Sequence, residues 1–325
     1  MLKRRSFQFC AVSLLSLPVL GTRAQEVFAV PVRLLVPYAA GGPSDILARK
    51  IGEQLGIRLK RAVVVDNRAG AGGAIAAAAT ARAQPDGNTI LWASATIAID
   101  PVLRPSLAYD VKELTPVVTM LISPLTILVN PKLPVKTVAE LVAYAKANPG
   151  KLNFGSAGVG TSLHLGTERF MLDAGIQMTH IPYKGAGQSI TALLSNDIQV
   201  LLQPITTAMQ YGKSGSVRVL AVTTPKRSNI MPDLPSVAES GVPGLEHFNA
   251  NMWYSLFVPV KTPAAVIDKL NHEVVACLKD TQLQQWLNEQ GVEILGDTPA
   301  QARQWFNDEV HAWGEVIRTT HITVD

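Results

Sequence analysis

The sequence predicts an α/β protein of two domains, each with a mainly parallel sheet covered on both faces by helices. Its 325 residues exceed the usual size of one domain. It is 47% hydrophobic and 17% charged, which is enough apolar material for a sizeable core. Apolar strand-like runs also alternate with helical segments along the chain, as in sheets whose parallel strands are joined by helices.

The first domain begins with an apolar strand at residues 32–36, in which Arg33 is the one polar residue. A helix follows from Pro43 to about Leu55, because Leu47, Ile51 and Leu55 recur at four-residue spacing. Proline suits the first position of a helix, where its missing N–H costs nothing. Further strands are expected at residues 62–65 and 89–92.

A long apolar run at residues 117–129, interrupted by Ser123-Pro124, indicates where the chain crosses to the second domain. Beyond it we expect strands at 152–154, 198–202 and 217–222, and a helix at 137–147 with Thr137 as its N-cap. Two more helices start at Thr262-Pro263 and Thr298-Pro299, and both carry an apolar stripe at helical spacing.

The first 24 residues have the features of a secretory signal peptide. Basic residues at positions 3–5 precede a short apolar run, and the segment ends in Thr22-Arg23-Ala24. The run is too short for a membrane anchor and is interrupted by Pro18. We therefore expect cleavage after Ala24 and a periplasmic protein. The general export route is favoured, and Arg4-Arg5 leaves the twin-arginine route as an alternative.

Removal of this segment changes the charge and the cysteine content. Four of the 29 basic residues lie within it and no acidic residue does, so the mature chain has 25 of each sign. The basic excess that nucleic-acid binding requires is lost, and no nucleic-acid partner is expected. Cys10 leaves with the segment, and Cys277 alone cannot form a disulfide within the chain.

Motifs for catalysis, metals and nucleotides are missing from the sequence. It has no G-x-S-x-G, no His-Glu-x-x-His and no Cys-x-x-Cys motif, and its histidines are scattered. The glycine run from Gly70 has Ile75 where the dinucleotide fingerprint requires Gly or Ala. We expect no cofactor, no metal and no catalytic residue. A secreted hydrolase remains an alternative, since a catalytic triad needs no proximity in sequence.

Three glycine-containing loops, at residues 38–45, 155–162 and 183–187, each lie between an apolar strand and the start of a helix. In open α/β sheets such loops lie at the carboxyl ends of the strands, where ligands bind. Helix starts offer unpaired N–H groups and partial positive charge to anions. Two such loops facing each other would enclose a small carboxylate, with hydroxyl donors from Ser44, Ser156, Thr161 and Ser162.

Several segments together resemble one known family. They include "VRLLVPYAAGGPSDILAR", "VVVDNRAGAGG", "PGKLNFGSAGVGTSLHL" and "HIPYKGAGQSITALL", in that order. The resemblance runs from Val32 to the C-terminus and is to the solute receptors of tripartite tricarboxylate transporters, also called Bug-type periplasmic receptors. It implies a two-lobed, type II periplasmic-binding-protein fold that closes around its ligand. Lobe 1 would comprise residues 25–122 and 250–325, and lobe 2 residues 123–249.

The resemblance also implies a function. Such receptors bind a small organic carboxylate in the cleft, through backbone N–H groups, hydroxyls and ordered water, and deliver it to membrane permease subunits. We expect a monomer that is not an enzyme. A sensory receptor that uses the same fold is a further alternative.

The expected ligand-binding residues come mainly from two facing loops. The first contributes Tyr38, Ala39, Ala40, Gly41, Gly42, Ser44 and Asp45. The second contributes Ser156, Ala157, Gly158, Gly160, Thr161, Ser162 and His164. The resemblance further places Ser94, Tyr183, Lys184 and Trp253 near the cleft.

One position departs from the family pattern. Many members have an Asp facing the cleft after the strand at 200–202, where it can pair with an amino group, whereas this chain has Gln203. A neutral side chain there argues against an amino-acid ligand. It favours an aliphatic or aromatic acid without an amino group.

Overall fold

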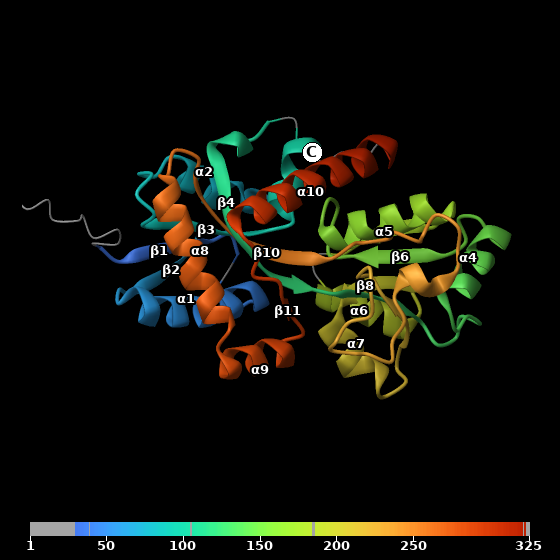
Figure 1. The fold of residues 1–325 in the computed structure, drawn as a ribbon. Coiled ribbons are helices and arrows are strands. Elements are labelled where there is room, and N and C mark those ends of the chain that lie inside the picture. Colours follow the sequence, from blue (N-terminus) through green and yellow to red (C-terminus); the bar gives the residue numbers. More distant parts are fainter. Residues whose placement is uncertain (1–29, 39, 105, 184–185, 321, 323–325) are drawn as a thin grey trace, which may run out of the picture.

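The computed structural model describes residues 30–38, 40–104, 106–183, 186–320 and 322. The predicted signal peptide, Ala39 and Lys184 lie outside these residues. The chain forms two α/β lobes side by side, each built on one sheet (Figure 1). The two-lobed α/β fold class is thereby confirmed.

Each sheet draws its strands from a different part of the chain. The six-stranded sheet has the order β11-β4-β10-β3-β1-β2. Its strands are β1 (Val32–Val36), β2 (Val63–Asn67), β3 (Thr89–Ser94), β4 (Leu114–Ser123), β10 (Met252–Pro259) and β11 (Glu293–Ile294). The five-stranded sheet has the order β7-β6-β8-β5-β9. Its strands are β5 (Leu125–Val129), β6 (Asn153–Ser156), β7 (Thr179–Pro182), β8 (Val200–Pro204) and β9 (Arg218–Val222).

Both sheets are mixed, which corrects the prediction of mainly parallel sheets. Only β1–β2, β1–β3, β6–β7 and β6–β8 pair in parallel among the described strands. The antiparallel pairs arise where the chain changes lobes. It leaves the first sheet through β4 and returns through β10, which lies between β3 and β4 and runs opposite to both.

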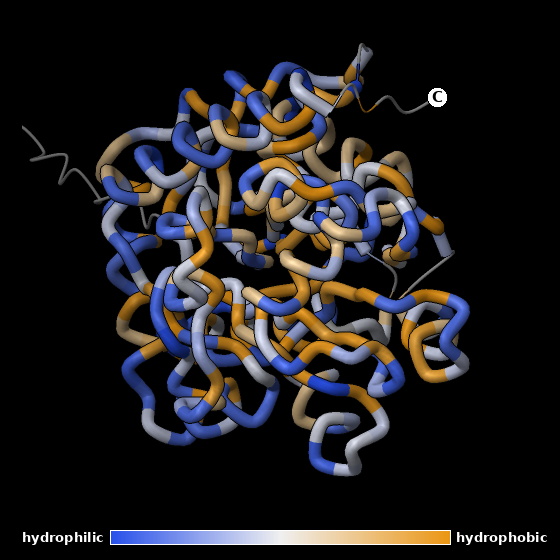
Figure 2. Tube along the Cα trace, turned by 90° about the vertical axis from the view of Figure 1, so that its right-hand side faces the viewer, coloured by the Kyte–Doolittle hydropathy of each residue, from blue (hydrophilic) through white to orange (hydrophobic). Residues whose placement is uncertain are grey.

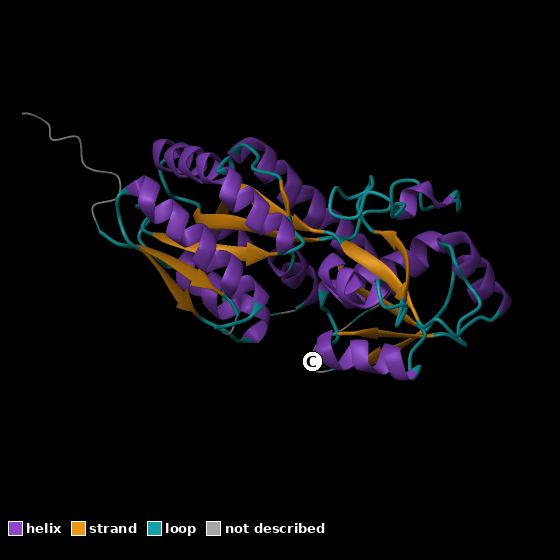
Figure 3. Cartoon of the chain, turned by 90° about the horizontal axis from the view of Figure 1, so that it is seen from below, coloured by secondary structure: helices purple, strands orange, loops and turns teal. Residues whose placement is uncertain are grey.

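The first sheet has a separate apolar core on each face, because successive side chains of a strand point to opposite sides. Leu34 packs with the helices α1 (Pro43–Leu59), α8 (Ala264–Leu278) and α9 (Thr281–Glu289). Its neighbour Leu35 packs with α2 (Ala74–Ala81), α3 (Thr96–Leu103) and α10 (Pro299–Thr320). Figure 3 shows the helices around the strands of each lobe.

The second sheet is covered in the same way. Leu202 faces a core shared with α4 (Val138–Ala147) and α5 (Ser162–Ala174), and Leu201 faces α6 (Ala186–Ser195) and α7 (Ile205–Gly212). Hydrophobic residues follow the interior strands, and hydrophilic residues are common on the outer turns (Figure 2). Short 3₁₀ helices span Ala71–Gly73, Val111–Glu113 and Val237–Ser240. Among the described residues, no helix has both the length and the apolar character that crossing a membrane requires.

The lobes are linked by crossing strands and by packing between helices. The chain passes from β4 to β5 at Pro124, and it returns through Asn251, whose side chain lies 3.1 Å from the Thr223 hydroxyl. The C-terminal helix α10 extends toward α5 of the other lobe (Figure 1). Leu165 of α5 is buried in the apolar cluster that contains Trp313 of α10. These links position the loops on which a ligand site would depend.

Candidate ligand-binding site

A cavity of about 340 Å³ lies between the lobes. This volume is in the range of small-molecule sites. Its walls combine the segment after β1, the end of β4 and the start of β10 from the first lobe with the starts of α5, α6 and α7 from the second. The lining residues are Tyr38, Leu47, Thr96, Ser123, Ala157, Thr161, Ser162, Leu163, Ala186, Pro204, Thr206, Met252, Tyr254, Gln290 and Val292.

The described lining residues carry no acidic and no basic side chain. About half are apolar, and the others offer hydroxyl groups or, in Gln290, an amide. A charged ligand in such a cavity is held by dipoles and N–H groups rather than by an ion pair, and these interactions strengthen where water is excluded. In the described part of the chain, no cluster of three His, Cys, Asp or Glu residues could hold a metal ion.

Asp45 is buried, with 2% of its surface exposed, and its side chain fixes the shape of the first loop. Its carboxylate accepts hydrogen bonds from the Gly41 N–H at 2.8 Å, from Arg49 Nε at 2.9 Å and from Asn67 Nδ2 at 2.8 Å. The Arg49 hydrogen bond, supported by those from Gly41 and Asn67, lowers the pKa of Asp45 to about 2. Gly41 has φ +82°, a conformation that favours glycine. Asp45 therefore holds the loop and is absent from the cavity lining.

Replacing Asp45 with Asn is expected to destabilise the protein by about 1 to 3 kcal/mol at pH 7, because a neutral amide cannot satisfy three donors. The carboxylate contributes stability above its unfolded pKa near 4, and this contribution is lost as the pH falls through 2. The difference between wild type and variant should therefore shrink from pH 4 to pH 2. Urea unfolding across this range measures it. A constant difference would contradict the role of the charge.

Tyr38, the first residue of this loop, belongs to a small network of hydroxyl groups. The Tyr38 hydroxyl lies 2.5 Å from Ser94 Oγ, which lies 3.1 Å from Thr96 Oγ1. Burial raises the pKa of Tyr38, so its phenol is neutral and can donate to a ligand. Ser94 itself is buried behind Tyr38.

The other residues of the first loop differ in exposure. Ala40 and Gly41 are exposed and Gly42 is partly buried. The Ser44 hydroxyl is buried and has no partner among the described residues.

The second loop presents the start of α5 to the cavity. Thr161 caps the helix: its hydroxyl accepts from the His164 N–H at 3.3 Å and donates to the Gly158 carbonyl at 2.8 Å. Gly158 has φ +129° and Gly160 has φ +77°, so both adopt conformations that L side chains rarely take. This shape places Ala157, Thr161 and Ser162 in the lining.

Four other predicted residues lie behind the lining. Ser156, in the second loop, and His164, in the first turn of α5, are both buried. The Tyr183 ring packs against β6, where its Cε2 would lie 3.4 Å from a Cβ added at Gly155. Gln203 is buried, and its amide donates to Ser189 Oγ at 3.1 Å. The Gln203 side chain therefore contacts α6 and does not line the cavity.

Trp253 lies on the opposite face of β10 from the cavity. It is 1% exposed, and its indole N–H donates to Glu309 of α10 at 2.7 Å. Met252 and Tyr254, its neighbours in sequence, line the cavity instead, as the alternation of side chains along a strand requires. The sequence reasoning did not identify the other lining residues, which are Leu47, Thr96, Ser123, Leu163, Ala186, Pro204, Thr206, Met252, Tyr254, Gln290 and Val292. For Met252 and Tyr254, this alternation was an available signal.

A segment that we call the clasp, residues 290–293, closes one side of the cavity. Gln290 and Val292 line it. Gly291 has φ +68°, and a Cβ there would lie 2.4 Å from Thr206 Cγ2 of the other lobe. The Glu293 carboxylate accepts from Ser228 Oγ at 2.5 Å and from the Asn229 N–H at 3.2 Å. The clasp therefore joins β11 of the first lobe to loops of the second.

Two α/β lobes with a cavity of small-molecule size between them form the architecture of two-lobed solute-binding proteins. A family model described as "Tripartite tricarboxylate transporter family receptor" matches residues 47–322. The chain belongs to this receptor family. Its relatives are binding proteins and receptors, not enzymes.

Three relatives illustrate the likeness. BugT of Bordetella pertussis is 35% identical over 295 residues, which cover 90% of each chain. The structure of R. palustris Rpa4515 with adipate is 32% identical, with a TM-score of 0.77, and covers 91% of this chain and 98% of that one. MatC of Rhodopseudomonas palustris with bound malate is 28% identical, with a TM-score of 0.73 and coverage of 89% and 99%.

Proposed function

We propose that this protein is a periplasmic receptor that binds a small organic carboxylate between its lobes and delivers it to the permease subunits of a tripartite tricarboxylate-type transporter. The observation that carries this proposal is the cavity between the lobes, lined by hydroxyls and the start of α5 and free of charged side chains among its described residues. A carboxylate there would be bound by N–H groups, hydroxyls and ordered water. The predicted signal peptide supports the periplasmic location.

The lining also supports a proposal for the class of acid. An α-amino group buried in this cavity would have no carboxylate partner among the described lining residues, and burying an unpaired charge is costly. Apolar side chains such as Leu47, Leu163 and Met252 instead suit a hydrocarbon chain or ring. The ligand is therefore an acid without an amino group. Adipate and malate, which are bound by the related structures, are members of this class.

Isothermal titration calorimetry with the mature protein tests this assignment. Adipate, malate and benzoate represent acids without an amino group, and aspartate and glutamate serve as matched amino acids. We expect at least one of the first three to bind more tightly than both amino acids, and to be recovered unchanged after incubation. Tight binding of aspartate or glutamate alone would overturn the ligand class. Chemical conversion of the bound acid would overturn the receptor function.

A further inference from the structure

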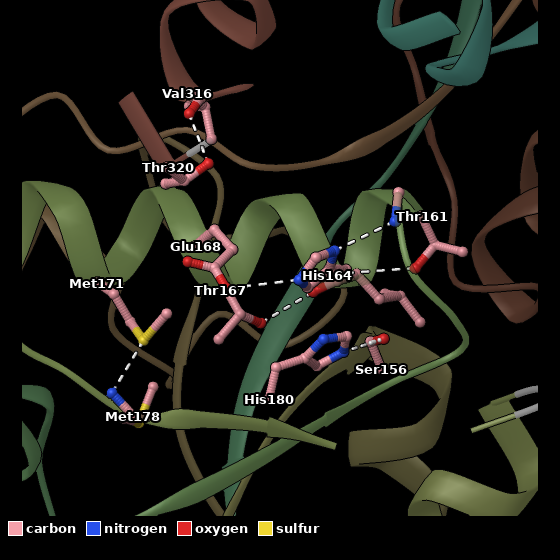
Figure 4. Close-up of polar contacts among 12 residues, drawn as sticks. Ser156, Thr161, His164, Thr167, Glu168, Met171, Met178, His180, Val316 and Thr320 are labelled. Atoms are coloured by element: carbon pink, nitrogen blue, oxygen red, sulfur yellow. Dashed lines mark hydrogen bonds and ion pairs between the residues drawn. The ribbon is translucent and has the colours of Figure 1, made fainter. Parts of the chain in front are cut away.

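Two histidine rings, those of His164 and His180, lie one above the other beside the second loop (Figure 4). The ring centroids of His164, on α5, and His180, on β7, are 3.9 Å apart with an interplanar angle of 15°. Phe154 of β6 stacks on His180 at 4.8 Å. The three rings come from three different elements. Together they form a stack that packs against residues 156–161.

The His164 ring accepts a hydrogen bond that requires one nitrogen to be unprotonated. The Gly160 N–H points to His164 Nδ1 at 3.1 Å. The ring proton must then be on Nε2, which lies 3.4 Å from Glu168 Oε1. A second proton on this ring would go to Nδ1 and would displace the Gly160 N–H. The observed loop therefore requires neutral His164.

The His180 ring holds the other end of the same loop. Its Nε2 lies 2.7 Å from Ser156 Oγ, which in turn lies 3.1 Å from the Gly158 N–H and 3.0 Å from the Gly158 carbonyl. If Ser156 donates to that carbonyl, it accepts from His180 Nε2. Burial lowers the pKa of His180 to about 4. Two positive rings cannot be stacked at this distance without strong repulsion.

We propose that His164 and His180 are positioning residues of the ligand loop: as stacked, neutral rings they fix Gly160 and Ser156, and thereby the cavity residues Ala157, Thr161 and Ser162. Neither ring belongs to the cavity lining. Both rings act through the loop. We therefore expect their substitution to lower ligand affinity while the fold is kept. The affinity part of this proposal rests on the proposed function, whereas the positioning part concerns the unliganded protein.

Acid should loosen this arrangement. Glu168 of α5 faces His164. Tyr183, which follows β7, carries a phenol that is neutral throughout the acid range, and burial raises its pKa further. On α10, which packs against α5, Glu309 is bound instead by the indoles of Trp253 and Trp313. The unfolded chain takes up a proton near pH 6.5 and the folded His180 near pH 4. Stability should therefore fall as the pH drops from 6.5 to 4.

Paired substitutions separate positioning from general packing. His164→Asn keeps an acceptor near the place of Nδ1 but cannot take up a proton, whereas His164→Leu removes the acceptor. We expect His164→Leu to weaken binding of the tightest acid among adipate, malate and benzoate about tenfold, as for a lost buried hydrogen bond. His164→Asn should restore most of the affinity. His272→Asn, at an exposed position on α8, is the matched control and should bind like wild type.

The unliganded mature protein provides the deciding experiment. Long-range ¹H–¹⁵N NMR at pH 7 should show both rings neutral, with the His164 proton on Nε2, and hydrogen exchange should show a protected Gly160 amide that His164→Leu exposes. A charged His164, a proton on its Nδ1 or an unchanged Gly160 amide in His164→Leu would overturn the proposal. If the NMR result holds and none of the three acids binds, the proposed ligand class fails while loop positioning stands. Equal affinity of His164→Leu and wild type would overturn the link to binding.

Discussion

Gly158→Val is expected to weaken carboxylate binding by about a hundredfold, without unfolding either lobe. Gly158 has φ +129° at the turn of the second loop, and a β-branched residue there is a genuine outlier whose strain costs about 1 to 3 kcal/mol. The loop would relieve this strain by changing shape. Ala157, Thr161 and Ser162 would then leave their places in the cavity wall. Calorimetry with the tightest acid of the panel measures the loss.

Gly150→Val is the matched control for this result. Gly150 also has positive φ, +70°, and its Cβ would meet no atom within 4 Å. It lies between α4 and β6 and is absent from the cavity lining. This variant should lose a similar amount of stability and bind the ligand like wild type. Equal losses of affinity in both variants would show that Gly158 acts through stability alone.

Gly291→Val is expected to have the second large effect, because it forces the clasp away from the other lobe. A Cβ at residue 291 would lie 2.4 Å from Thr206 Cγ2 and 3.1 Å from Ile205 Cγ2, and the residue has φ +68°. Separation of these segments would also break the hydrogen bonds from Ser228 and Asn229 to Glu293. We expect affinity to fall at least tenfold, mainly through faster ligand release.

Small-angle scattering tests the separation of the lobes directly. The radius of gyration of ligand-saturated Gly291→Val should exceed that of ligand-saturated wild type. Gly296→Val is the control, since Gly296 has φ +62° and its nearest neighbours, Leu278 and Ile294, belong to its own lobe. Glu293→Gln should show a milder loss of affinity. A compact Gly291→Val protein with unchanged ligand release would refute the role of the clasp.

Local patterns in the sequence predicted most of the individual elements. Thr137 caps α4 by accepting from the Glu140 N–H, and α10 begins at Pro299, both as expected. Sheet order and strand direction could not be predicted in this way, because they depend on pairings between distant segments such as β10 and β4. The strands β10 and β11 and the helices α3, α7 and α9 were also missed. Asp280, which caps α9, was an available start signal.

The site was predictable where a short segment determines the geometry. The loops at 38–45 and 155–162 come from strand–glycine–helix patterns, and both contribute to the cavity. The opposite wall, with Gln290 and Val292, meets these loops only after the chain has folded back from the second lobe. His180 was missed for the same reason, since its partners Ser156 and His164 lie on other elements.

A crystal structure of the mature protein with the tightest acid of the calorimetric panel tests the central claim most directly. We predict the acid between the lobes, with carboxylate oxygens within hydrogen-bond distance, directly or through one water, of Thr161, Ser162 or the first-loop backbone. Its hydrocarbon part should contact Leu47, Leu163 or Met252. A carboxylate bound outside this cavity, or paired with a lysine or arginine side chain, would contradict the account.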